Sequence, residues 1–182
     1  EMASGLSMPV GFKNSTDGNL QVAIDAMVAA RSSHSFLGID QDGRTGVVRT
    51  TGNPHVHMIM RGGRNGPNYG SESISKAIGL LGQANLSCSV MVDCSHANSG
   101  KNYQMQEHVW HEVMRQRREG TDAIIGLMIE SNINEGRQEV ATDGRALRYG
   151  VSVTDECIDW KTTERLILTT AEADCRAPRN AN

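Results

Sequence analysis

The stretch Val90-Met-Val-Asp-Cys-Ser-His-Ala-Asn-Ser99 decides the fold class of this chain. Its apolar part, from Ser89 to Val92, has the length of a buried strand in a parallel sheet. Polar side chains gather where that strand ends, and Gly100 follows as a break. A strand that carries a histidine, here His96, at its carboxyl end is typical of an α/β-barrel active site. An ordinary strand-to-helix loop with a surface histidine would look the same, so the other strands must decide.

Three further apolar segments end in an ionisable side chain. Residues 8–14 carry Lys13 near their end, and Val56–Met60 is followed directly by Arg61. Residues 123–130 are apolar until Glu130. Helical apolar spacing follows these strands, over residues 20–30, 71–83, 104–118 and 162–173. Strands that alternate with helices predict a parallel α/β sheet with right-handed crossovers. If the sheet curves into a barrel, the four ionisable groups point into one pocket.

Other segments interrupt this alternation. Two β-prone runs within residues 34–51 are joined through Asp42-Gly43, which indicates an inserted β-hairpin. Asp17 is the expected N-terminal cap of the helix over residues 20–30. Residues 149–155 precede the last helix, and the tail 176–182 is expected to be disordered. The folded domain is therefore expected to span residues 1–175.

Composition narrows the class of protein. The 182 residues carry a net charge of −3, which gives no basic bias toward nucleic acid. No apolar run approaches the roughly 20 residues of a membrane span, and residues 1–4 are not expected to begin a signal peptide. The four cysteines lack CxxC spacing and are expected to be free thiols in a reducing compartment. We therefore expect a cytoplasmic α/β protein that binds neither nucleic acid nor membrane.

The residue types at the strand ends indicate a chemistry. His96 and Glu130, with Asp155 beyond the last strand, suit Mn²⁺, Fe²⁺, Co²⁺ or Zn²⁺, and such a metal polarises a carbonyl or activates water. Lys13 and Arg61, the latter beside Gly62-Gly63, suit a phosphorylated or carboxylated anion. The pattern favours metal-assisted chemistry on a phosphorylated carbonyl compound.

Five motifs, in order along the chain, resemble the 3-deoxy-7-phosphoheptulonate (DAHP) synthase family. The similarity is to its short-chain, feedback-regulated class I type and covers nearly the whole chain. The motifs are Pro9-Val-Gly-Phe-Lys-Asn-Ser-Thr-Asp-Gly18, Arg61-Gly-Gly-Arg-Asn-Gly-Pro-Asn-Tyr69, Met91-Val-Asp-Cys-Ser-His-Ala-Asn-Ser99, Ile125-Gly-Leu-Met-Ile-Glu-Ser131 and Tyr149-Gly-Val-Ser-Val-Thr-Asp-Glu-Cys-Ile-Asp-Trp160.

The resemblance implies an enzyme of the shikimate pathway of aromatic amino acid biosynthesis. The family condenses phosphoenolpyruvate with erythrose 4-phosphate and releases phosphate. Lys13 and Arg61 resemble its phosphoenolpyruvate ligands, and His96, Glu130 and Asp155 resemble three of its four metal ligands. Asp155 also corresponds to a position close to the aldehyde substrate. By this resemblance the catalytic residues are Lys13, Arg61 and His96.

The resemblance also implies that part of the site is missing. The family has a TIM (β/α)₈ barrel, which typically needs about 250 residues. This chain supplies what resemble the last four βα units and lacks the family's metal-binding Cys, its earlier arginines and its Lys-Pro-Arg segment. It is similar to a C-terminal half, and we expect it to be inactive alone. Open edge strands would favour association with another chain.

Regulation by an aromatic amino acid is a further implication. The hairpin, with Phe36 and Gly38, and the nearby Ser7 resemble the family's effector region. Gly38 and the sequences of residues 93–95 and 126–129 are more similar to tyrosine-sensitive than to phenylalanine-sensitive forms. The same hairpin could serve only as a contact between copies, and a homo-oligomer is expected in either case.

Two alternatives to an active DAHP synthase remain. The first is 3-deoxy-8-phosphooctulonate synthase, which shares the barrel and mechanism but has different motif wording. The second is a catalytically incomplete fragment that acts only as a folding or association partner.

Overall fold

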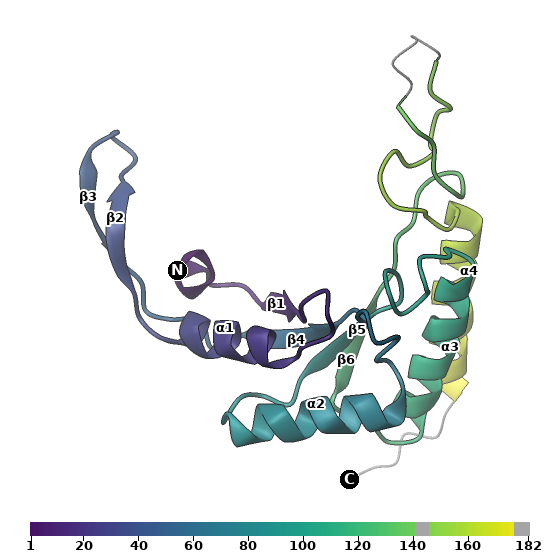
Figure 1. Cartoon of the computed structure of the whole chain (residues 1–182), viewed down its shortest axis with the longest axis horizontal. Coiled ribbons are helices and arrows are strands. Elements are labelled where there is room, and N and C mark those ends of the chain that lie inside the picture. Colours follow the sequence, from purple (N-terminus) through teal and green to yellow (C-terminus); the bar gives the residue numbers. More distant parts are fainter. Residues whose placement is uncertain (141–145, 177–182) are drawn as a thin grey trace.

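The computed structural model describes residues 1–140 and 146–176. Its core is a four-stranded sheet with four helices, and a separate two-stranded hairpin stands apart (Figure 1). The elements in chain order are η1 (Met2–Gly5), β1 (Val10–Lys13), α1 (Gln21–Arg31), β2 (Ser35–Ile39), β3 (Thr45–Arg49), β4 (Val56–Met60), α2 (Ser71–Gln83), β5 (Val90–Asp93), α3 (Met105–Arg118), β6 (Ile124–Met128) and α4 (Trp160–Arg176).

The large sheet is parallel throughout, with strand order β1-β4-β5-β6. Lys13 pairs with Ile59 and Met60 with Val92, so the carboxyl ends of neighbouring strands lie at one edge. The predicted alternation of strands and helices is confirmed. The predicted hairpin is confirmed too, since β2 pairs antiparallel with β3.

The two faces of the sheet differ in what covers them. Side chains at Val56, Met58 and Met60 on β4, with Val90 and Val92 on β5, join the apolar core with the helices. That core takes the predicted apolar positions of α1 and α2, including Met27 and Leu81, which are fully buried. In Figure 1 the α-helices lie along one side of the curved sheet, and none of them covers the other side. The burial of one face drives folding, because buried apolar area is the main favourable contribution to stability.

The hairpin extends away from the sheet, at the end of the molecule opposite α4 (Figure 1). Its base is fixed by Thr50, whose Oγ1 lies 2.8 Å from Ser4 Oγ and accepts the His34 backbone N–H at 2.9 Å. Beyond that base, Leu37 and Val47 face each other across the two strands and are 76% and 73% exposed. The hairpin thus presents an apolar surface, as a contact with another chain would require.

Three local expectations need correction. Asp17 does not cap α1, because its carboxylate accepts the Asn19 N–H within the preceding turn and it is Asn19 Oδ1 that accepts the Gln21 N–H. The last strand is shorter than predicted and only its first residue is buried, since β6 lies at an edge of the sheet. Helix α4 continues to Arg176, and the rest of the predicted disordered tail lies outside the described residues.

An ion pair between Arg165 and Glu107 links α3 to α4. The two guanidinium nitrogens Nη1 and Nη2 of Arg165 donate to the two carboxylate oxygens of Glu107, each at 2.8 Å. The hydrogen bonds from Arg165 hold the pKa of Glu107 below its usual value of 4.5. Bidentate geometry makes this pair stronger than an ordinary surface contact.

We expect Glu107→Gln to reduce stability at neutral pH by up to about 1 kcal/mol, since solvent screens a partly exposed pair. A lowered folded-state pKa stabilises the fold above the unfolded-state value of about 4.5. This contribution disappears as the pH falls through the lower folded-state pKa. Urea unfolding between pH 7 and pH 3 should therefore show a difference between Glu107→Gln and wild type that vanishes in acid. Glu164→Gln, an exposed change on α4, should show no such difference.

Candidate metal and anion site

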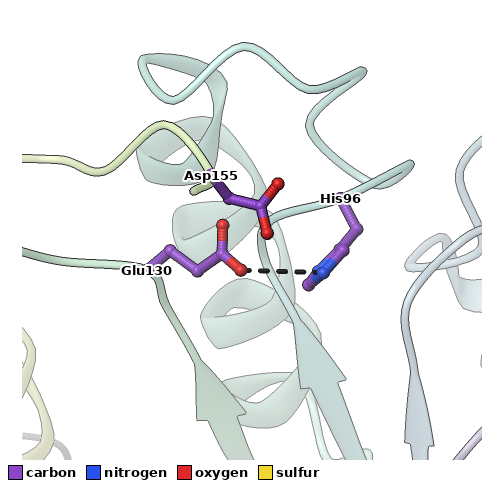
Figure 2. A group of neighbouring side chains, drawn as sticks. All are labelled: His96, Glu130 and Asp155. Carbon is purple, nitrogen blue, oxygen red and sulfur yellow. Dashed lines mark ion pairs between the residues drawn. The ribbon is translucent and has the colours of Figure 1, made fainter. Parts of the chain in front are cut away.

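Three side chains from separate loops converge at the carboxyl edge of the sheet (Figure 2). His96, Glu130 and Asp155 each offer one ligand atom, and these atoms all lie within 4.8 Å of one another. His96 follows β5 and Glu130 follows β6, while Asp155 comes from the segment before α4. In Figure 2 the imidazole and both carboxylates point toward one another, and His96 Nε2 lies 3.6 Å from Glu130 Oε1. The structure therefore brings together all three residues that the sequence predicts as metal ligands.

Two of these residues, His96 and Glu130, are constrained through their backbone. His96 has a φ of +55°, a left-handed conformation that is uncommon for residues other than glycine. Glu130 is held by Gln106 of α3, which is fully buried. Gln106 Oε1 accepts the Glu130 N–H at 2.8 Å, and its Nε2 donates to the Glu130 carbonyl at 3.2 Å. A strained backbone and a buried amide clamp both indicate that the positions of these side chains are constrained.

Lys13 joins the same region through Asp93. Its Nζ lies 2.6 Å from Asp93 Oδ2, and the His96 Nδ1 lies 3.0 Å from that same oxygen. Burial alone would raise the pKa of Asp93, but hydrogen bonds from Lys13 and Ser95 outweigh it and hold the pKa below its usual value. Asp93 is therefore a carboxylate that places the predicted anion-binding lysine beside the predicted metal ligand.

Three asparagines tie the loop after β4 to its neighbours. Asn14 Oδ1 accepts the Arg61 N–H at 2.9 Å, and Asn14 Nδ2 donates to the Gly62 carbonyl at 2.9 Å. Asn68 Oδ1 accepts the Gly62 N–H, and Asn98 Oδ1 accepts the Asn68 N–H, both at 2.8 Å. These side-chain amides form hydrogen bonds with backbone N–H and C=O groups of the loop, which in a helix or strand would pair with other backbone groups. The loop carrying Arg61 is thereby fixed relative to the loop carrying His96.

Not every predicted residue is brought into the cluster. The backbone of Arg61 is held, but its half-buried side chain makes no hydrogen bond or ion pair within residues 1–140 and 146–176. Of the predicted effector residues, Phe36 and Gly38 share one side of β2, and Ser7 is exposed three residues after the Ser4 that contacts the hairpin base. Ser7 thus follows a segment that contacts the hairpin base, but the structure shows no hydrogen bond between Ser7 and Phe36 or Gly38.

The charges of the cluster suit a cation. Burial raises the pKa of Glu130, His96 lowers it in part, and the neighbouring Asp155 and Asp93 raise it further. Carboxylates that repel one another are stabilised by a bound cation, which is the usual role of a metal in such a group. One imidazole with two carboxylates and no thiolate matches the donor set of Mn²⁺, Fe²⁺, Co²⁺ or Zn²⁺. The residues present therefore fit a divalent transition metal.

None of the three cysteines whose side chains the structure describes belongs to the group of ligand atoms. Cys94 is fully buried, and burial raises the pKa of its thiol, so it is a packed thiol of the core. Cys88, Cys94 and Cys157 are free thiols in the part of the chain that the structure describes. This state agrees with the absence of CxxC spacing.

Sequence reasoning missed the residues that hold the ligands in place. Asp93 was visible within the deciding stretch, but its contact with Lys13 spans 80 positions and depends on strand order. Asn14, Asn68 and Asn98 look like ordinary loop residues until the loops are brought together. Gln106 was the one with a usable signal, because it is a polar residue at a helix position whose neighbours Val109 and Val113 are apolar.

We expect Gln106→Leu to destabilise the fold by about 1–3 kcal/mol, because it leaves the N–H of Glu130 without a partner, although the Glu130 carbonyl still accepts the Ile158 N–H at 3.0 Å. The freed Glu130 should also lower Co²⁺ affinity by about tenfold, as supporting residues of metal ligands usually do. Thermal unfolding and cobalt titration measure the two effects. Gln104→Leu, at an exposed position just before α3, is the matched control and should change neither. A Gln106→Leu protein with wild-type stability would show that the clamp is unimportant.

The model of a known protein family, described as the DAHP synthetase I family, matches residues 1–168. The chain belongs to this family. It is 52% identical over 167 residues to the tyrosine-sensitive phospho-2-dehydro-3-deoxyheptonate aldolase of Salmonella typhimurium, covering 92% of this chain and 47% of that protein. It is 48% identical over 178 residues to the phenylalanine-inhibited enzyme of Saccharomyces cerevisiae, covering 94% of this chain and 48% of that one.

A solved structure of a DAHP synthetase I relative matches the fold. The phospho-2-dehydro-3-deoxyheptonate aldolase of Francisella tularensis superposes with a TM-score of 0.88 at 42% identity, covering 95% of this chain and 50% of that chain. The chain thus spans about half the length of these relatives. None of the helices in residues 1–140 and 146–176 is both long and apolar enough to cross a membrane.

Proposed function

We propose that this chain carries the metal-binding and part of the phosphoenolpyruvate-binding machinery of a DAHP synthase. The reaction is the aldol-type condensation of phosphoenolpyruvate with erythrose 4-phosphate to 3-deoxy-D-arabino-heptulosonate 7-phosphate. The observation that carries the proposal is the convergence of His96, Glu130 and Asp155 within 4.8 Å, beside Lys13, in a member of the DAHP synthetase I family.

Each residue has a chemically defined role in this proposal. His96, Glu130 and Asp155 hold the divalent metal, which supplies Lewis acidity toward the aldehyde oxygen when it is bound. Lys13 and Arg61 bind phosphoenolpyruvate, the lysine as a point charge and the arginine through its planar fork. Asp155 lies beside His96 and Glu130 although it comes from a different loop, and its exposed carboxylate is open to the aldehyde substrate.

The same proposal requires further strands to complete a barrel around this sheet. The uncovered face of the sheet carries Ile59, Met91 and Lys13, which pair laterally along β4, β5 and β1. In a (β/α)₈ barrel this face lines the interior, and further strands would pair with the open edges of β1 and β6. We therefore expect the 182 residues alone to be inactive and to need the rest of the barrel for catalysis.

The test is phosphoenolpyruvate consumption with Mn²⁺ and erythrose 4-phosphate. The chain is assayed alone and then mixed with the part of the Salmonella typhimurium relative that lies outside the matched segment. Activity in the mixture only is the expected result, and Lys13→Ala should abolish it. Mixtures that remain inactive while forming a stable complex would favour the alternative, a catalytically incomplete association partner. Consumption with arabinose 5-phosphate instead of erythrose 4-phosphate would indicate a 3-deoxy-8-phosphooctulonate synthase.

We propose tyrosine as the effector, since relatives at about half identity are named tyrosine-sensitive, as the Salmonella typhimurium protein is. The site would combine Ser7 with Phe36 and Gly38 of the hairpin, whose exposed Leu37 and Val47 favour a homo-oligomer contact. Phenylalanine is the competing effector, because the Saccharomyces cerevisiae relative is named phenylalanine-inhibited. Binding of each amino acid to the chain and to Gly38→Val, measured by calorimetry, separates the two.

A further inference from the structure

Asp93 uses both of its carboxylate oxygens, and it is fully buried at the end of β5. Oδ1 accepts the Ser95 N–H at 2.9 Å and the Ser95 hydroxyl at 2.6 Å. Oδ2 accepts from Lys13 Nζ at 2.6 Å and lies 3.0 Å from His96 Nδ1. One carboxylate therefore contacts a predicted anion-binding residue and a predicted metal ligand at the same time.

These contacts determine which imidazole nitrogen of His96 carries the hydrogen. Nδ1 faces Asp93 Oδ2, which can only accept, and lies 2.7 Å from Ser95 Oγ. Because the Ser95 hydroxyl hydrogen is already donated to Asp93, its oxygen also acts as an acceptor toward Nδ1. A hydrogen on Nδ1 satisfies both oxygens. Without it, Nδ1 would face two oxygens with no hydrogen between them.

A hydrogen on the other imidazole nitrogen, Nε2, would not be within hydrogen-bond distance of Glu130. Glu130 Oε1 lies 3.6 Å from Nε2, which is beyond hydrogen-bond distance. The favoured neutral form thus carries its hydrogen on Nδ1 and presents the Nε2 lone pair to Glu130 and Asp155. That lone pair is what a metal would bind, and the second nitrogen of a metal-binding histidine is commonly fixed by a carboxylate in this way.

We propose that Asp93 is a positioning residue that sets the tautomer of His96 and the place of the Lys13 ammonium. The tautomer follows from the contacts alone, while its purpose, to prepare the metal and anion sites together, rests on the proposed function. Both groups contact the same oxygen, Oδ2. The separation between the metal-facing nitrogen and the anion-binding cation is therefore set by a single buried atom.

Asp93→Asn is the informative change because it reverses the direction of the hydrogen bond between residue 93 and the Ser95 hydroxyl. Lys13 can only donate, so the amide oxygen must take the Oδ2 position and the NH₂ group must take the Oδ1 position. The NH₂ then donates to Ser95 Oγ, and the Ser95 hydroxyl becomes free to donate to His96 Nδ1. The substitution keeps the side-chain shape but favours the tautomer with hydrogen on Nε2. The NH₂ also meets the Ser95 N–H, so the variant loses that hydrogen bond.

The experiment is ¹⁵N NMR of the imidazoles in the metal-free, ¹⁵N-labelled chain at about pH 8, where imidazoles are neutral. Comparison with His96→Ala identifies the His96 signals among those of the six histidines. We expect the hydrogen on Nδ1 in wild type, and a shift toward Nε2 in Asp93→Asn. Asp25→Asn, an exposed charge-matched control on α1, should match wild type. Hydrogen on Nε2 in wild type would overturn the inference without any variant, and so would an unchanged tautomer in a folded Asp93→Asn.

A cobalt titration of the same proteins separates this inference from the proposed function. Asp93→Asn should bind Co²⁺ about 10–100-fold more weakly than wild type. If the wild-type chain has the expected tautomer and binds no cobalt, the proposed metal role fails while the positioning by Asp93 stands. If cobalt binds equally to wild type and Asp93→Asn, the positioning role is overturned.

Discussion

His96→Ala is expected to lower the affinity of this chain for Co²⁺ by more than about 100-fold, because supporting residues alone account for 10–100-fold. In free energy that is about 2.7 kcal/mol or more. The cluster has three ligand atoms within 4.8 Å, and His96 supplies its one nitrogen. Two mutually repelling carboxylates, Glu130 and Asp155, would remain. Visible absorption of the cobalt complex measures the loss directly, since nitrogen ligation changes its spectrum.

A change in folding must be separated from a change in metal binding. His96→Gly is suited to this, because glycine accepts the φ of +55° at no steric cost. It should be at least as stable as His96→Ala while binding cobalt equally weakly. His55→Ala, at an exposed position before β4, is the matched histidine control and should bind as wild type does. Wild-type affinity in His96→Ala would place the metal elsewhere and refute the ligand assignment.

The elements of the core could be predicted because their signals are local. The helix spacing over residues 71–83 reproduces α2, and the Asp42-Gly43 turn gives the hairpin. The ends of β6 and the cap of α1 were predicted wrongly for a different reason. Strand length at β6 depends on its edge position in the sheet, and at α1 the choice between Asp17 and Asn19 depends on the turn that precedes the helix.

The residues of the site also fall into two groups, those that local sequence signals predict and those that they do not. The ligands His96, Glu130 and Asp155 could be predicted because each directly follows an apolar strand or lies in a recognisable motif. Their supports could not, since the contacts of Asp93 with Lys13 and of Gln106 with Glu130 join residues 80 and 24 positions apart. Such contacts depend on strand order and register, which the spacing of residues does not specify. The sequence therefore indicates the chemistry, and only the fold shows what holds it in place.

Gly62→Ala is expected to destabilise the protein by about 2–4 kcal/mol, combining backbone strain with a steric clash. Gly62 has a φ of +72°, in the left-handed region that side chains disfavour. A Cβ there would lie 2.8 Å from the carbonyl carbon and the Cβ of Ala97, and 2.8 Å from the Asn98 nitrogen. The clash is with backbone, so no side-chain rotation can relieve it. The midpoint of thermal unfolding should fall by roughly 10 °C.

The same substitution tests whether the two loops act as one unit. To accommodate a Cβ, the loop of Arg61 must move away from the loop of His96, which breaks the hydrogen bond from the Asn68 N–H to Asn98 Oδ1 between them. Cobalt affinity should therefore fall together with stability, although Gly62 is not a ligand. Gly79→Ala is the control: its Cβ would meet nothing within 4 Å in the middle of α2, where alanine stabilises a helix by about 1 kcal/mol. A stable Gly62→Ala with weakened cobalt binding would still support coupling of the loops, whereas unchanged stability and affinity would show that they move independently.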